Sequence, residues 1–155
     1  AINGLEWSNP NRDNKFAHRL AYTNQLIIGR KFSPNLSLQI APTLIHKNLV
    51  PLANDVNDIV ALGIAGRYKL SKRMALNLEY FWRLPNEGAN NYDLFKDSFS
   101  VGVDLETGGH VFQFHLTNSL AMVEKGFVSE SNADWLDGGI HFGFNITREF
   151  TLKRH

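Results

Sequence analysis

Apolar and polar side chains alternate with a period of two along most of this 155-residue chain. Between Leu36 and Leu44, apolar residues stand at every even position, and smaller or polar residues stand between them. Because successive side chains of a β-strand point to opposite faces, this pattern predicts a strand with one apolar face. Later repeats cover residues 60–70, 74–82, 98–106, 112–117 and 140–147, and Phe81 is the one misfit in the repeat at 74–82.

The connections between these segments are of two kinds that alternate strictly. Three are short turns, at residues 33–35, 71–73 and 107–109, and four are longer polar loops, at residues 8–16, 48–57, 85–96 and 123–137. With two less regular segments near the N-terminus, the sequence predicts about eight antiparallel strands. Short periplasmic turns and longer external loops are typical of up-and-down barrels in outer membranes. We therefore predict an all-β fold, a single antiparallel transmembrane β-barrel domain over residues 1–155.

The residues on the polar faces indicate which side of the wall meets lipid. Small residues there are mixed with a few charges, which suits a crowded lumen better than a solvated exterior. Aromatic residues that would fit a lipid–water interface stand near several strand ends: Trp7, Tyr22, Tyr68, Tyr80, Trp82 and Phe150. The alternative is a soluble, lipocalin-like periplasmic barrel that binds a small apolar ligand, and it requires Leu38, Leu78 and Phe114 to face inward.

Bulk composition excludes several other classes. A formal net charge of +1 with dispersed basic residues gives no basis for nucleic-acid binding. The chain has no cysteine, which excludes thiol catalysis, disulfides and cysteine-ligated metals. No apolar run approaches the roughly 18 residues of a membrane-spanning helix. The N-terminus shows no export signal and begins as though cut in mid-strand.

Polar residues in the predicted strands are candidates for the lumen: Arg67, Glu79, Asp104, Glu106, Gln113, His115, His141 and Asn145. Charged members of this set could form a constriction that selects ions or small polar solutes. They could equally form a structural ladder of paired charges. We favour the ladder, because eight strands alone enclose a space that side chains fill.

Histidines offer two chemical hypotheses, neither of which we favour. His115 and His141 fall on the polar side of strands predicted to pair, as a lumenal metal or haem ligand pair would require. We instead expect hydrogen-bonded lumen histidines, with no metal and no cofactor. His115, Asn118 and Ser119 match in composition the catalytic set of an outer-membrane phospholipase, but His115 and Ser119 would lie roughly 13 Å apart on a strand. We therefore expect that the protein is not an enzyme. A lipid-modifying enzyme of the outer membrane stays as the second alternative to the leading functional hypothesis.

Several stretches resemble a known family: residues 36–44, 61–70, 106–113, 117–119 and 140–146. The family is that of uncharacterised outer-membrane β-barrels of Bacteroidetes, domain of unknown function 5777. The resemblance implies a bacterial outer-membrane location and no established substrate or catalytic residue. Members are longer at the N-terminus, so this chain resembles a C-terminal portion whose wall a missing N-terminal segment or another membrane protein chain would complete.

The final strand adds to the membrane interpretation. Residues 140–146 alternate apolar and polar, and Phe150 continues the register, as in the terminal signal of outer-membrane barrels. The leading functional hypothesis is an integral outer-membrane protein, surrounded by lipid, that acts as a narrow porin-like channel, a structural scaffold or a docking platform. Its external loops, such as residues 123–137, would be available for contacts.

Overall fold

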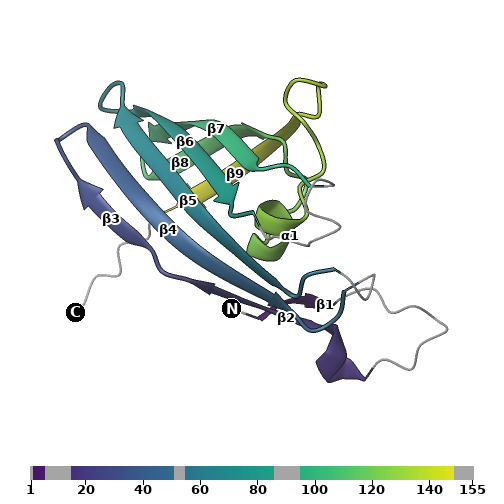
Figure 1. Ribbon diagram of the computed structural model, residues 1–155. Coiled ribbons are helices and arrows are strands. Elements are labelled where there is room, and N and C mark those ends of the chain that lie inside the picture. The colour runs from purple at the N-terminus through teal and green to yellow at the C-terminus, as the bar shows by residue number, and fades with distance from the viewer. Residues whose placement is uncertain (1, 6–14, 51–54, 86–94, 149–155) are drawn as a thin grey trace, which may run out of the picture.

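The protein forms one curled antiparallel sheet with a short helix on its concave side (Figure 1). The computed structural model describes residues 2–5, 15–50, 55–85 and 95–148. The strands are β1 (Ile2–Leu5), β2 (Leu20–Gln25), β3 (Ile28–Lys31), β4 (Leu36–Lys47), β5 (Asp58–Lys69), β6 (Met74–Arg83), β7 (Ser98–Thr107), β8 (His110–Thr117) and β9 (His141–Arg148). A 3₁₀ turn, η1 (Phe16–Arg19), precedes β2, and the helix α1 (Glu124–Ser129) precedes β9.

The wall runs in the order β1-β2-β4-β5-β6-β7-β8-β9, and β3 pairs with β4 beside β2. Leu26, between β2 and β3, donates its N–H to the carbonyl of Pro42 on β4 at 3.1 Å. Pro42 has no N–H, so it cannot donate a hydrogen bond back to the strand that contains Leu26. The ladder of backbone hydrogen bonds is therefore interrupted at this point. β2 and β3 thus occupy one position, and the wall has the eight antiparallel positions that the sequence predicts. The all-β fold class is confirmed.

The two faces of the sheet have opposite chemistry. On the concave side, small residues such as Ala41, Thr43 and Ala61 are buried. On the convex side, Leu38 is 41% exposed and Leu78 45% exposed. The soluble alternative required such side chains to face inward, and the structure shows this expectation to be wrong. Convex exposure of apolar side chains is typical of a wall that meets lipid.

Phe114 also contradicts the soluble alternative. It lies on the same side of β8 as Phe112, and its ring stacks at 6.2 Å from that of Phe142 on β9. The rings of Phe112 and Phe144 stack at 6.4 Å on the same face. Because Phe142 and Phe144 are themselves exposed, the four rings form an aromatic patch on the convex surface.

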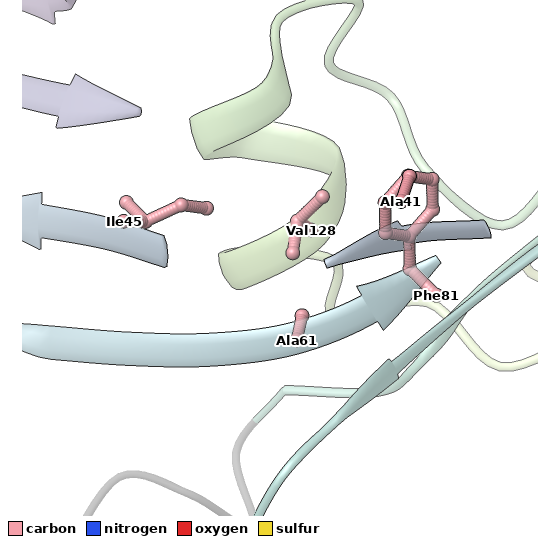
Figure 2. Packing of buried hydrophobic residues seen from close by; sticks show 5 residues of the cluster. All are labelled: Ala41, Ile45, Ala61, Phe81 and Val128. Carbon is pink, nitrogen blue, oxygen red and sulfur yellow. The ribbon is translucent and has the colours of Figure 1, made fainter. Parts of the chain in front are cut away.

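Helix α1 packs into the concave face near the ends of β4 and β6. Val128 is fully buried against Ile45, Ala61 and Phe81, as Figure 2 shows. The ring of Phe81 meets that of Phe127 edge-on at 5.2 Å between centroids. Phe81 therefore breaks the alternation because it contacts a helix inside the curl. The sequence predicts that residues 123–137 form an external loop that is free for contacts. This is wrong for α1, because burial of its apolar side chains stabilises the position of the helix against the concave face.

Aromatic residues near strand ends lie partly as expected. Tyr68, Tyr80 and Trp82 are exposed on the convex face, and the ring of Tyr22 stacks on that of His46 at 6.5 Å. Trp7 and Phe150 lie outside the described residues. No helix within the described ranges is long and apolar enough to cross a membrane.

Candidate functional site on the concave face

Polar residues of the concave face form rows that cross four neighbouring strands. Register places Glu79 opposite Ser100, Ser100 opposite Thr117, and Thr117 opposite His141. The next two rows are Asn77, Gly102, His115 and Gly143, followed by Ala75, Asp104, Gln113 and Asn145. Antiparallel pairing in this register brings side chains from distant parts of the sequence to adjacent positions.

Asp104 on β7 is the centre of a hydrogen-bond network. Its Oδ1 accepts bonds from Asn77 at 2.7 Å and Gln113 at 3.2 Å, and its Oδ2 accepts one from Arg67 Nε at 3.1 Å. Asp104 is 6% exposed, so these bonds compensate for the desolvation of its charge. One ion pair, Arg67 with Asp104, thus lies on the concave face, and the amides of Asn77 and Gln113 complete its hydrogen bonds.

A cavity of about 300 Å³ lies beside this network. Its wall comes from β6 to β9, and Ala121, Met122 and Phe127 line it from the segment before and within α1. Within the described ranges, no hydrogen bond or ion pair engages the side chains of Glu79 or His115, which also line the cavity. A second hollow of about 520 Å³ over β3 to β6 shares Asn77 and Glu79 of the concave register with the first. Together they form a polar groove along the concave face.

His115 depends on two glycines in its row. A Cβ atom on Gly143 would collide with the imidazole ring of His115, so the ring lies directly over Gly143. A Cβ on Gly102 would come within 2.9 Å of the Phe114 carbonyl oxygen. His141 lies one row away from His115. In the part of the chain that the structure describes, no three His, Asp or Glu side chains gather as a metal site.

Asn118, at the end of β8, holds the following segment in place. Its side-chain Nδ2 donates to the carbonyls of Asp97 at 2.9 Å and Ala133 at 3.0 Å, and its Oδ1 accepts from the N–H of Phe99 at 2.9 Å. Its own carbonyl accepts from the Ser131 hydroxyl at 2.9 Å. Residues 119–140, which we call the inserted segment, are therefore tied to the start of β7.

Ion pairs fix the inserted segment to the wall. Glu130, which follows α1, accepts bonds from Lys47 Nζ at 2.6 Å and from Lys125 Nζ at 3.3 Å. Both lysines are less than a tenth exposed. On the next strand pair, Arg83 Nε lies 3.7 Å from Asp97 Oδ1. A packed helix and paired charges thus cover the end of the groove beside α1.

The sequence-predicted lumen residues separate into three groups. Arg67, Asp104 and Gln113 share one network. Glu79, His115 and Asn145 line the cavity, and His141 lies in the adjoining row. Glu106 is exposed near the short turns and outside these groups.

Sequence reasoning assigned no structural role to Asn77, Asn118, Lys47 or Glu130. The polar register of 74–82 contains Asn77, and its alternation could have indicated a lumen position. Asn118 enters the sequence argument through its stretch of the family resemblance and through its composition match with His115 and Ser119. In the structure its amide bonds to backbone groups, and the Ser119 hydroxyl donates to the Ala121 carbonyl at 3.3 Å.

Comparison with known proteins identifies a family that matches almost the whole chain. A family model described as "Membrane bound beta barrel domain (DUF5777)" matches residues 1–150. This match confirms the resemblance inferred from the sequence. No curated protein and no solved structure matches the chain.

Proposed function

This chain belongs to the family of membrane-bound β-barrel domains, and from that premise we propose that it forms the wall of a bacterial outer-membrane barrel with a narrow, plugged lumen. The proposed activity is restricted passage of small polar solutes along the concave groove. The observation that carries this proposal is the insertion of residues 119–140 across the loop end of a polar groove, behind an apolar convex wall.

The outer membrane is supported by the arrangement of connections. The turns at residues 33–35, 71–73 and 107–109 join strands at one end, which we call the turn end. The strand ends that the longer connections join lie at the other end with the inserted segment, and we call it the loop end. Short turns face the periplasm and longer loops face outward in barrels of this kind. We therefore assign the plugged end to the cell exterior and lipid as the partner of the convex face.

The open sheet supports a wall larger than this chain. Within the described residues, β1 and β9 each lack a strand on one side. Unpaired strand edges are not tolerated in the hydrocarbon of a bilayer. Eight strands would also leave a lumen filled by side chains, with no room for α1. Further antiparallel strands, from another segment or another membrane protein chain, would complete the barrel.

The hydrogen-bond network of Asp104 supports restricted passage of solutes, as opposed to free conduction of ions through the lumen. Its carboxylate is already shared by three donors, so it offers no free charge to a passing ion. Glu79 and His115 remain as polar groups that line the path. A solute would therefore meet hydrogen-bonding groups of a narrow passage once the inserted segment moves.

Gel mobility and bilayer conductance test the proposal together. The membrane-extracted protein should migrate differently before and after boiling, because a closed barrel resists detergent. In planar bilayers the wild type should conduct little. The variant Asn118→Ala should conduct more, because the inserted segment loses its tie to β7.

Asn132→Ala is the matched control, since Asn132 is an exposed asparagine in the same segment. A large, steady conductance in the wild type would contradict the plug. No conductance in Asn118→Ala, despite a normal heat-dependent shift, would favour a scaffold or docking barrel. A soluble chain without any shift would overturn the membrane assignment.

We also propose that the barrel is not an enzyme. The engagement of Asn118 with backbone groups supports this, because a catalytic amide would have to orient a histidine. A lipase assay on the inserted wild type checks it. Activity that disappears in His115→Ala would overturn this part of the proposal.

A further inference from the structure

The two ends of the wall differ in charge. Within the described residues, the turn end carries two carboxylates, Glu106 and Asp104, and Arg67 pairs with the second. It also carries six further basic side chains: Arg30, Lys31, Lys69, Lys72, Arg73 and Arg148. We call these six residues the basic rim. Acidic and basic residues are nearly balanced at the loop end, although that end carries the longer connections. The field at the turn end is therefore positive, and it favours an anionic partner.

The charges of the two ends also differ in pairing. At the loop end, ion pairs join Lys47 to Glu130, Arg83 to Asp97, and Lys96 to Asp134. Among the described residues, no ion pair engages Arg30, Lys31, Lys69, Lys72 or Arg73. Five cations at one rim are thus left to interact with groups outside this part of the chain.

The rim borders an apolar surface, which identifies the kind of partner. Arg30 pairs with Leu38 of the convex register, and its guanidinium lies 5.4 Å from the centre of the exposed Phe32 ring. Exposed apolar side chains continue along the same border: Tyr68, Leu70, Met74 and Leu105. A free anion or an acidic protein would not need this apolar border. A lipid offers both an anionic headgroup and acyl chains next to it.

We propose that the basic rim binds the phosphate headgroups of anionic phospholipids in the leaflet beside the short turns. The inference rests on the proposed membrane location and adds the lipid class. Arg30 is the principal contact among the five cations without an ion pair, because the register places it on the convex face. Arg148 lies on the same face at the opposite side of the wall. Lys31 and Lys69 occupy the concave register, opposite Ser37 and Ala75, and face away from lipid.

Spin-labelled lipids test this contact in reconstituted membranes. Electron paramagnetic resonance measures how strongly the protein immobilises labelled phosphatidylglycerol relative to labelled phosphatidylcholine. A basic side chain at the membrane surface favours an anionic lipid about fivefold at its own site. Most other lipid sites around the wall have no such preference, so the average ratio of immobilised phosphatidylglycerol to immobilised phosphatidylcholine should be about two. The ratio should fall toward one in Arg30→Gln/Arg148→Gln and at high salt.

Lys31→Gln/Lys69→Gln is the matched control, because it removes the same charge from the same end on the concave face. Its ratio should stay at the wild-type value. A wild-type ratio of one, or equal falls in both double variants, would overturn the inference. A fall caused by inorganic phosphate, but not by chloride of equal ionic strength, would show that the rim binds free phosphate and would also overturn it.

Heat-dependent gel mobility separates this inference from the proposed function. A protein that shows the shift but has a lipid ratio of one remains a membrane barrel without the headgroup contact. A wild type that shows no shift and does not insert contradicts both proposals.

Discussion

The loop end and the turn end of the same wall are stabilised in different ways. At the loop end, α1 buries Val128 against the concave face, and Glu130 joins two lysines. At the turn end, the strands are joined by short turns, and five basic side chains have no ion-pair partner in the described chain: Arg30, Lys31, Lys69, Lys72 and Arg73. The difference shows that one end depends on contacts within the protein, whereas the other depends on its surroundings. Substitutions at the two ends should therefore differ in cost.

The largest effect is expected for Phe81→Ala. Phe81 is buried between the sheet and Phe127, so its truncation leaves a cavity under α1 and should cost about 3–5 kcal/mol. Urea unfolding of the refolded barrel measures this free energy. Phe32→Ala is the control at the turn end, where the ring is exposed and its truncation leaves no cavity in the protein, and it should cost clearly less than Phe81→Ala. Equal losses in the two variants would break the comparison.

Asn118→Ala should destabilise the loop end somewhat less. The substitution leaves a backbone N–H and two carbonyls without the amide, each worth about 1 kcal/mol, for a total of about 3 kcal/mol. The same urea titration gives the value. Asn132→Ala should leave stability unchanged, because Asn132 is exposed. A loss of unfolding free energy in Asn118→Ala but not in Asn132→Ala would support the conclusion that Asn118 holds the inserted segment against β7.

Glu130→Gln should have an intermediate effect. It leaves the Lys47 and Lys125 ammonium groups facing a neutral amide in a buried site. We expect a loss of about 2 kcal/mol, below the range for fully buried pairs because the Glu130 side chain is partly exposed. Glu106→Gln removes a carboxylate from the turn end and should change the unfolding free energy by about 0.5 kcal/mol or less. Equal unfolding free energies of Glu130→Gln and Glu106→Gln would contradict the view that buried ion pairs stabilise the loop end.

The smallest effect is expected for Lys72→Gln. Lys72 is exposed in the turn between β5 and β6 and has no ion pair in the described chain, so the unfolding free energy should change by about 0.5 kcal/mol or less. Urea unfolding in neutral detergent measures it without anionic lipid. A loss comparable to that of Glu130→Gln would show that the turn end also depends on internal contacts.

Much of the candidate site could be predicted because strand geometry is local. Alternation places Arg67, Asp104 and Gln113 on one face whatever the register of pairing. Their hydrogen bonds could not be predicted, because a bond requires the strands to align within one residue. The structure supplies that alignment by setting Asp104 beside Gln113 and bringing Arg67 across β6.

The inserted segment was predicted poorly for a physical reason. Its helix has six residues, too few to show a helical period or to be stable alone. Its charged residues are typical of a solvent-exposed loop: Glu124, Lys125, Glu130, Asp134 and Asp137. Phe81 carried the available signal, because a large apolar side chain in a polar register needs an apolar partner inside the barrel.

Sequence by itself determined which side chains share a face, where the strands end and which connections are short, because these follow from the two-residue repeat and turn chemistry. Only the tertiary structure decided that the sheet curls around α1, that Asn118 and Glu130 hold the inserted segment, and that β1 and β9 are the edge strands of the described sheet. These features depend on contacts between residues far apart in the chain, and a local pattern does not specify such contacts.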